Sequence, residues 1–338
     1  MKFDYYVFNS YVPEIDGSGP ELYAKWIEQV ELADELGFHC AWFTEHHFGL
    51  LGGMLPNPQV LSAALASRTK RIRFGSAVSL LVIHNPLRVA EDMAMLDVLT
   101  GGRVEVGAGR GMNQTNYAAF GADPDTAQER FEEALEVLVR GWTEEQFTFQ
   151  GRFFSWTKPV TVRPRPVQRP HPPVWLPVSH DPEHGRDMGR HGFNLLTIPW
   201  HAGFERSRHI IDGYRTGLRD AGHDAADKEV LGMYYTHVAE TPELARRRAV
   251  GPWANHARIS AEDRGSPDRA PRDYDTVVEN IGAIFGDPEM CRRHVARIQS
   301  ELGLDRLACV FHFGGMPQEH VLDSMRLFAT DVAPAFQD

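Results

Sequence analysis

Glu45, His46 and His47 follow a short apolar run, and they are the first residues in the chain whose types could do chemistry together. An imidazole at such a position could exchange a proton near neutral pH or hydrogen-bond a developing anion. The alternative is a pair of half-buried histidines satisfied by backbone carbonyls. A metal site is disfavoured, because adjacent strand residues point to opposite faces and the chain contains no His-x-His pair.

Two further candidates could bind a phosphate. The glycine-rich string from Gly107 to Gly111 contains Arg110, whose planar guanidinium suits an anion that the glycines would let approach the backbone. The string lacks the lysine of a Walker motif and is not followed by the acidic residue of a dinucleotide fold, so a tight turn with a solvated arginine is the alternative. Ser179 and His180 precede an expected helix, whose free N–H groups could receive a phosphate; an ordinary helix cap is the alternative there.

The elements that must position these residues alternate along the chain. Short apolar runs, each followed by an amphipathic stretch, predict right-handed βαβ units and a parallel sheet. Eight such units favour a closed (β/α)8 TIM barrel over an open doubly wound sheet, and in such a barrel function collects at the carboxyl ends of the strands. The expected strands are Tyr5–Phe8, Cys40–Thr44, Ile72–Ser79, Val104–Ala108, Val174–Val178, Asn194–Ile198, Leu231–Val238 and Leu307–His312.

Two segments interrupt this α/β alternation. Residues 147–173 are rich in proline and mixed in charge, which predicts a surface insertion with a possible hairpin and not a second domain. Residues 257–274 are highly charged and lack apolar periodicity, which predicts a mobile lid between two helices. We therefore expect a single barrel domain over residues 1–338.

Composition limits the partners. The formal net charge of the 338-residue chain is −11, which argues against a nucleic acid or an anionic membrane as the main partner. No apolar run reaches the roughly 18–20 residues of a membrane span, and the first residues do not form a signal peptide. Three cysteines, Cys40, Cys291 and Cys309, are an odd and sparse set that fits free thiols in a reducing cytosol. We expect a cytoplasmic protein.

Several motifs resemble the bacterial luciferase-like family of flavin-dependent monooxygenases. The continuous stretch from Arg71 to Gly121 carries the skeleton HNPLRVAED…LD…GGRVEVG.GRG, which is specific to that family. Upstream, the motif WFTEHHF from Trp42 to Phe48 is similar to the family's second-strand signature. The likeness covers most of the chain and is weakest at residues 148–170 and 253–275.

The resemblance implies a TIM barrel that binds reduced FMN, with His46 as the catalytic imidazole and a pKa near neutrality. Arg110 would grip the flavin phosphate, and Ala77-Val78 falls where the family often carries a non-prolyl cis peptide beneath the flavin ring. The implied cofactor-binding residues are Ala77, Val78, Arg110, Gly111, Met112, Ser179 and His180.

The implied activity is that of a two-component monooxygenase. A separate NAD(P)H:flavin reductase would supply FMNH2, which would react with O2 to a C4a-peroxyflavin and pass one oxygen atom to an apolar or aromatic organic substrate. A homodimer formed through barrel helices is expected. An F420-dependent oxidoreductase and a non-catalytic flavin-binding protein remain alternatives. The Gly-Arg-Gly sequence after the fourth strand favours FMN over F420.

Overall fold

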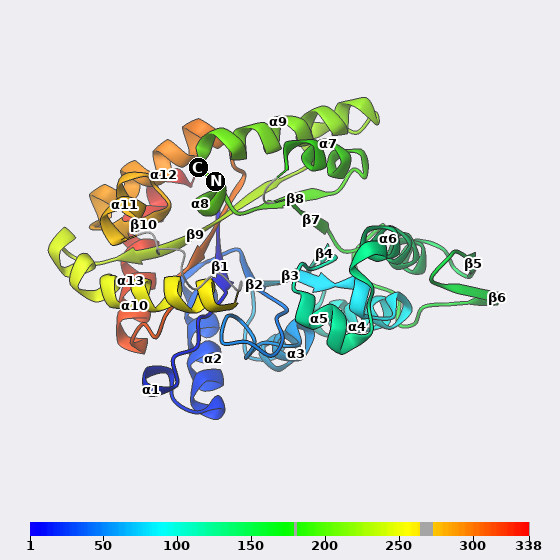
Figure 1. The fold of residues 1–338 in the computed structure, drawn as a ribbon, viewed down its shortest axis with the longest axis horizontal. Helices are drawn as coiled ribbons and strands as arrows, with labels where there is room; N and C mark the ends of the chain where they lie inside the picture. Colours follow the sequence, from blue (N-terminus) through cyan, green and yellow to red (C-terminus); the bar gives the residue numbers. More distant parts are fainter. Residues whose placement is uncertain (179–180, 264–272, 338) are drawn as a thin grey trace.

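The computed structural model describes residues 1–178, 181–263 and 273–337, and within them eight parallel strands close into a barrel (Figure 1). Tyr5 of the first strand pairs with Ala41 of the second and with Cys309 of the last, so that the sheet closes on itself. The TIM barrel predicted from the sequence is confirmed. Its strands are β1 (Lys2–Val7), β2 (Cys40–Phe43), β3 (Arg73–Leu80), β4 (Val104–Gly109), β7 (Val174–Val178), β8 (Asn194–Thr197), β9 (Val230–Val238) and β11 (Arg306–Val310).

One additional parallel strand, β10 (Ala283–Gly286), is not predicted by the sequence pattern. It pairs with the distal half of β9, with Ala283 beside Tyr235 and Gly286 beside Val238. All four of its residues are buried. A run this short without alternation cannot be told from a buried helical turn, and only the pairing with β9 makes it a strand.

Helices surround the barrel, and their ends follow local sequence signals (Figure 1). At the start of α4 the Asn85 side chain accepts a hydrogen bond from the backbone N–H of Leu87 at 3.0 Å, and Gly101 ends the helix at a φ of +65°. None of the helices in the described ranges is long and apolar enough to cross a membrane. The helices are α1 (Pro13–Asp16), α2 (Gly19–Leu36), α3 (Pro58–Ala66), α4 (Pro86–Thr100), α5 (Gln114–Phe120), α6 (Ala127–Thr143), α7 (Pro182–Arg190), α8 (Pro199–Ala202), α9 (Phe204–Asp220), α10 (Pro242–Asp263), α11 (Tyr274–Glu279), α12 (Pro288–Leu302) and α13 (Gln318–Leu327).

The insertion expected at residues 147–173 contains the predicted hairpin. Strands β5 (Phe147–Gln150) and β6 (Ser155–Val160) pair in the antiparallel sense and project from the body of the barrel (Figure 1). The remainder of the insertion, residues 161–173, returns along the barrel to β7 without further strands.

The prediction of a lid over residues 257–274 is wrong at both ends of that range. Residues 257–263 are the last turns of α10, in which Ile259 and Ser260 are buried, and Tyr274 is the first residue of α11. The buried positions Trp253, His256, Ile259 and Ser260 keep a helical spacing, but two of these four are polar, which conceals the period in the sequence. Residues 264–272 lie outside the described part of the chain.

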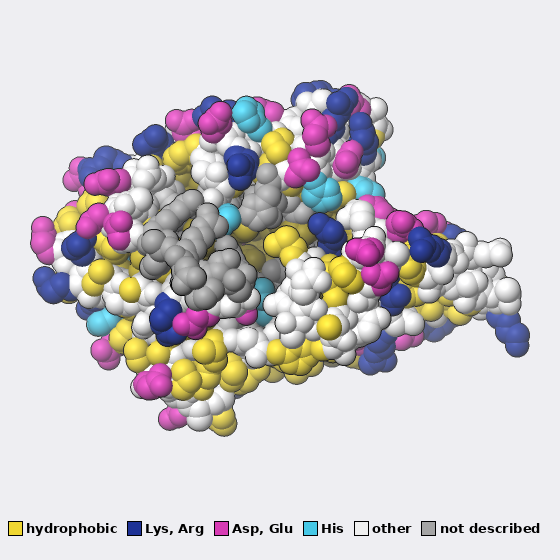
Figure 2. All heavy atoms as spheres, in the orientation of Figure 1, with side chains coloured by type: hydrophobic (Ala, Val, Ile, Leu, Met, Phe, Trp, Pro, Cys, Tyr) yellow, Lys and Arg dark blue, Asp and Glu magenta, His cyan; other side chains and the backbone are white. Residues whose placement is uncertain are grey.

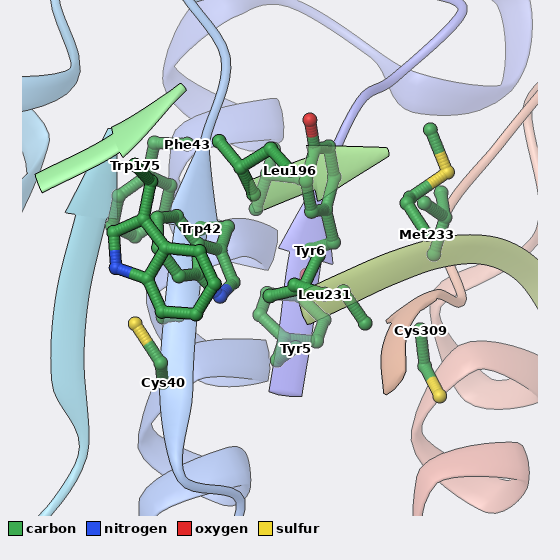
Figure 3. Close-up of a cluster of buried hydrophobic side chains, with 14 of the residues drawn as sticks. Tyr5, Tyr6, Cys40, Trp42, Phe43, Trp175, Leu196, Leu231, Met233 and Cys309 are labelled. Atoms are coloured by element: carbon green, nitrogen blue, oxygen red, sulfur yellow. The ribbon is translucent and has the colours of Figure 1, made fainter. Parts of the chain in front are cut away.

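The amino ends of the strands are filled by tryptophans and a buried ion-pair network. Arg306 Nη1 lies 3.0 Å from Glu105 Oε1, and the Trp175 indole donates to Glu105 Oε2 at 2.7 Å. Trp42 donates to Asp4 Oδ2 at 2.7 Å and packs edge to face on Trp175, with ring centroids 5.3 Å apart (Figure 3). The barrel floor is therefore closed, which leaves the carboxyl ends of the strands for a site.

The protonation of Asp4 makes the stability of the folded protein depend on pH. Burial raises the pKa of Asp4 to about 7, although the charge of Arg306 and the hydrogen bond from Trp42 oppose the shift. A carboxyl whose pKa is raised in the folded state contributes stability at low pH that is lost as the pH rises through that value. The substitution Asp4→Asn keeps a neutral hydrogen-bond acceptor, so we expect its melting temperature relative to wild type to increase between pH 5.5 and pH 8.5.

Thermal unfolding of both proteins across this pH range checks the prediction. The same substitution at exposed Asp125 should leave the difference from wild type constant with pH. A difference for Asp4→Asn that does not change with pH would contradict the assignment.

Candidate active site

The carboxyl ends of the first four strands bring the predicted site residues into one neighbourhood. The ring of His46, after β2, lies against the ring of Phe8, after β1, with centroids 5.1 Å apart. The Tyr6 hydroxyl of β1 donates to the backbone carbonyl of Ala77 in β3 at 3.2 Å. Strand β4 then leads directly into Arg110. These contacts confirm that chain segments far apart in sequence converge at this end of the barrel.

The Ala77-Val78 peptide bond is cis, as the family resemblance implies. It lies where the pairing register between β3 and β4 shifts, between Ser76 and Ser79. Gly109 of β4 lies so close that a Cβ there would stand 2.5 Å from Val78 Cγ2. The absence of a side chain at Gly109 therefore lets β4 pack directly against the cis bond.

His46 is a partly buried imidazole that stays neutral at physiological pH. Burial lowers its pKa to about 4, and the opposing charge of Glu45 does not compensate. The pKa near neutrality expected from the sequence is therefore wrong, because the sequence does not reveal the burial. Gly52 allows the close packing: a Cβ there would stand 2.9 Å from His46 Cγ, at a φ of +73°. A neutral imidazole offers a ring nitrogen that can accept a proton or a hydrogen bond.

Glu45 accepts hydrogen bonds from a set of donors of its own. The buried carboxylate accepts hydrogen bonds from His84 Nε2 at 2.6 Å, His47 Nε2 at 3.1 Å and the backbone N–H of Leu80 at 2.9 Å. The sequence reading did not single out His84 or the Tyr6 hydroxyl as site residues. The only local signal for His84 was its place in the HNPLRVAED motif.

The loop after β4 presents Arg110 to solvent. Within the described ranges the structure records no ion pair for its guanidinium, although the backbone is held in place: the Tyr117 hydroxyl donates to the carbonyls of Arg110 at 3.2 Å and Gly111 at 2.8 Å. Gly111 adopts a φ of +75°, and the side chain of Met112 is exposed. A free cation on a fixed loop is available for an anionic ligand.

The first turn of α7 lies close to this guanidinium. Burial lowers the pKa of His184 in that turn, and the positive charge of Arg110 lowers it further. The Asp181 side chain caps the helix by accepting from the N–H of Glu183 at 3.0 Å. Ser179 and His180, expected to help bind the phosphate, lie outside the described residues.

An aromatic wall of buried rings packs beside Phe8. We use this name for Trp200, Tyr235, Trp253 and His256, whose rings contact one another with centroids between 4.4 and 6.2 Å apart. The Ser10 hydroxyl lies 2.5 Å from His256 Nδ1 and fixes α10 against the end of β1.

His312, which follows the last strand, does not belong to the opening. It is buried, with Nε2 2.9 Å from Asp16 Oδ1 and Nδ1 3.2 Å from Gln29 Nε2. Its role is to hold α1 and α2 to the barrel.

The described residues fit a flat ligand with a polar edge and an anionic tail. Both polar atoms of the buried Asn9 amide, after β1, and the buried hydroxyl of Thr197, at the end of β8, have no hydrogen-bond partner within the described ranges. Buried polar groups are nearly always satisfied, so these atoms indicate a missing polar partner. The exposed guanidinium of Arg110 is a cation that could pair with a phosphate. A separate cavity of about 310 Å³, lined by residues including Trp200 and Tyr234, contains none of the expected flavin-binding residues and is not this site.

Comparisons with known proteins identify the family and the fold of this chain. The model of the luciferase-like monooxygenase family matches residues 1–306. The oxygenase component of the flavin-dependent trigonelline monooxygenase of Acinetobacter baylyi is 26% identical over 360 residues, covering 100% of this chain and 96% of that protein. Limonene 1,2-monooxygenase of Rhodococcus erythropolis is 30% identical over 325 residues, covering 92% and 80%.

Solved structures show the same fold. Monooxygenase RslO1 from Streptomyces bottropensis has a TM-score of 0.91 at 29% identity and covers 100% of both chains. A 3,6-diketocamphane monooxygenase component from Pseudomonas putida, solved with FMN, has a TM-score of 0.84, and an F420-dependent secondary alcohol dehydrogenase has one of 0.79, both at 20% identity. Fold and relatives together define an oxidoreductase, a flavin-dependent monooxygenase. The chain belongs to the luciferase-like monooxygenase family.

The role of Arg110 can be tested by binding. The substitution Arg110→Gln removes the charge that would pair with a phosphate, and hydrogen bonds to charged groups contribute about 1.5–3 kcal/mol, so we expect FMN to bind about 10- to 100-fold more weakly. Quenching of flavin fluorescence measures the dissociation constant. Arg293→Gln, at an exposed arginine on α12 that pairs with Glu289, is the matched control. An unchanged dissociation constant for Arg110→Gln would remove this residue from the site.

Proposed function

We propose that the protein is the oxygenase component of a two-component system that uses FMNH2 and O2 to oxygenate an apolar or aromatic organic substrate. The observation that carries the proposal is the convergence, at one barrel opening, of a neutral imidazole, a cis peptide bond and a free guanidinium: His46, Ala77-Val78 and Arg110. A bound reduced flavin would supply two electrons to O2, with one oxygen atom going to the substrate and the other leaving as water.

The residues of the chain would bind the cofactor, handle a proton and exclude water. Arg110, with Gly111, Met112, Ser179 and His180, would hold the phosphate, and Ala77 and Val78 would support the ring. Because His46 is neutral at pH 7, one of its ring nitrogens can accept a proton from the cofactor or the substrate. The aromatic wall, whose rings are buried, would keep water out of this end of the barrel.

The cofactor supply follows from what the chain lacks and from one relative. The sequence contains no dinucleotide fingerprint after its first or second strand, so a separate NAD(P)H:flavin reductase would deliver FMNH2. The trigonelline enzyme is itself named as an oxygenase component, which supports this division of labour.

Replacing the proposed catalytic imidazole tests the mechanism. We expect His46→Ala to bind oxidised FMN nearly as wild type does but to lower the yield of oxygenated product about 100-fold or more, the size of a typical general acid–base contribution. Limonene and a simple aromatic ketone serve as probe substrates, with product and hydrogen peroxide measured per FMNH2 consumed. A His46→Ala protein that forms product at the wild-type rate would contradict the assignment.

Rapid mixing separates the proposal from its alternatives. Anaerobic protein with FMNH2 is mixed with oxygenated buffer, and reoxidation is followed by absorbance. Reoxidation that is slower on the protein than in free solution supports an oxygenase, whereas reoxidation at the free rate with immediate peroxide release favours a passive flavin-binding protein. Parallel titration with reduced F420 tests the hydride-transfer alternative, for which tight binding of F420 and none of FMN would be decisive.

We also propose a homodimer, formed through α3 and α4. Four large apolar side chains are exposed on these two helices: Val60 on α3, and Met95, Val98 and Leu99 on α4. Figure 2 shows hydrophobic side chains at the surface over α3. Exposed apolar patches of this kind commonly mark protein–protein contacts.

Charged substitutions test this interface. We expect wild type to sediment at twice the chain mass of 38.1 kDa and the double variant Val60→Asp/Leu99→Asp to sediment as a monomer, because two buried charges would oppose association. Val250→Asp, at an exposed apolar residue of α10, should stay dimeric. A dimeric double variant, or a monomeric wild type, would contradict the proposed interface.

A further inference from the structure

The side chain of Glu45 collects three donors from two sides of the active-site opening. Its Oε1 accepts from His84 Nε2 at 2.6 Å and from His47 Nε2 at 3.1 Å, and its Oε2 accepts from the backbone N–H of Leu80 at 2.9 Å. The side chain is almost completely buried. A buried carboxylate without such partners would carry a large desolvation cost, so these hydrogen bonds are required to keep it ionised in place.

These hydrogen bonds connect the end of β2, which is followed by His46, to the segment of β3 that contains the cis peptide. Leu80 lies two residues after Val78, so the bond to its N–H fixes the segment of β3 that contains the cis peptide. Glu45 itself directly precedes His46, so the same side chain fixes the end of β2. Gln59 also holds this segment of β3, because its side chain donates to the Ser79 hydroxyl at 2.8 Å. The Glu45 carboxylate is therefore one direct link between the segment that carries His46 and the segment that carries Ala77-Val78.

The charge of this carboxylate is balanced by His84. Burial would raise the pKa of Glu45, but hydrogen bonds from His47 and His84 and the charge of His84 outweigh it and lower the pKa. Conversely, burial would lower the pKa of His84, and contact with Glu45 outweighs it and raises the pKa. His84 is 38% exposed and can exchange protons with solvent, whereas the side chain of His47 is only 9% exposed and packs on Phe120.

Other charged groups around His84 are already paired or act in the same direction. Asp92 of α4 also raises the pKa of His84 and lies 3.1 Å from Arg88. Glu91 lies 3.9 Å from the same arginine. Arg130 of α6 donates to the carbonyl of Val82, two residues before His84. The contact with Glu45 is thus the direct ion pair of His84.

We propose that Glu45 is a positioning residue of the flavin site and that protonated His84 is its charge partner, so that the geometry of His46 opposite Ala77-Val78 responds to the protonation of His84. This inference rests on the proposed function, because the groups that Glu45 positions are those proposed to contact the flavin. The His84 pKa is raised, so the ion pair is complete below the ordinary histidine value and is lost as the pH rises through the His84 pKa. Flavin affinity and reactivity should therefore decline as the pH rises through the raised pKa of His84.

Two variants separate charge from shape. His84→Gln keeps an N–H donor for Glu45 but cannot carry a charge. We therefore expect its FMN affinity not to change with pH. At low pH this affinity should equal the weaker affinity that wild type shows above the His84 pKa. Glu45→Gln keeps the shape but loses the charge, and we expect a tenfold or greater loss in both FMN affinity and the rate effect on FMNH2 reoxidation, since small misplacements of site groups carry losses of this order. The double variant should be no worse than Glu45→Gln alone, because both changes break the same interaction.

The readouts are the FMN dissociation constant from fluorescence quenching between pH 5.5 and pH 9, and FMNH2 reoxidation by rapid mixing. Histidine ring NMR titrations of ¹³C-labelled protein, with His84 assigned from its variant, give a readout independent of flavin. We expect the His84 pKa above the ordinary histidine value in wild type and at or below it in Glu45→Gln. Glu289→Gln, at an exposed glutamate on α12, is the matched control.

The outcomes distinguish this inference from the proposed function. If wild type binds FMN and both variants keep its affinity, pH profile and reoxidation rate, the positioning role is overturned and the function stands. If wild type does not bind FMN or FMNH2, the function is overturned, and the NMR titration still decides whether Glu45 controls His84. An unshifted His84 in Glu45→Gln would refute the ion pair, and equal melting temperatures of folded variants and wild type would show that any loss is not one of stability.

Discussion

The pairing of β1 with both β2 and β11 is the constraint on which the site depends. Because the strands are parallel and the sheet closes on itself, every strand delivers its carboxyl end to the same opening. Phe8, His46 and Arg110 come from three different strands, yet closure leaves each of them only one end of the barrel to occupy. The floor completes this arrangement: Arg306, Glu105 and the tryptophans that bind them fill the opposite end, so a ligand can enter from one side only.

Two neighbouring residues at this opening show how position on a strand end decides chemistry. Three donors keep Glu45 charged, whereas burial, without an acidic hydrogen-bond partner among the described residues, keeps His46 neutral. One residue is therefore suited to hold structure and the next to handle a proton. The sequence of the motif alone does not indicate that these two residues differ in role.

The cofactor region combines a rigid ring support with an exposed cation. Tyr6 and the side-chain-free Gly109 hold the Ala77-Val78 segment from two strands, and Tyr117 holds the loop of Arg110 through its backbone alone. Fixing the loop by its carbonyls leaves the guanidinium free. Such preorganisation reduces the ordering cost that binding would otherwise pay.

The sequence alone determined the elements whose signals are local. Asn85 and Gly101 mark the ends of α4 by cap geometry that needs no distant partner, and the eight apolar runs marked the barrel strands. The family motifs likewise pointed to His46, Arg110 and the cis bond at Ala77-Val78, which the structure confirms as cis. Only the tertiary structure decided the rest. It shows that β10 is a strand and that α10 extends to Asp263. It also shows that His312 is bonded to Asp16 and does not belong to the opening, and that His84 is bonded to Glu45. Burial and long-range hydrogen bonds decide these features, and both depend on residues far away in the chain, so no local pattern contains them.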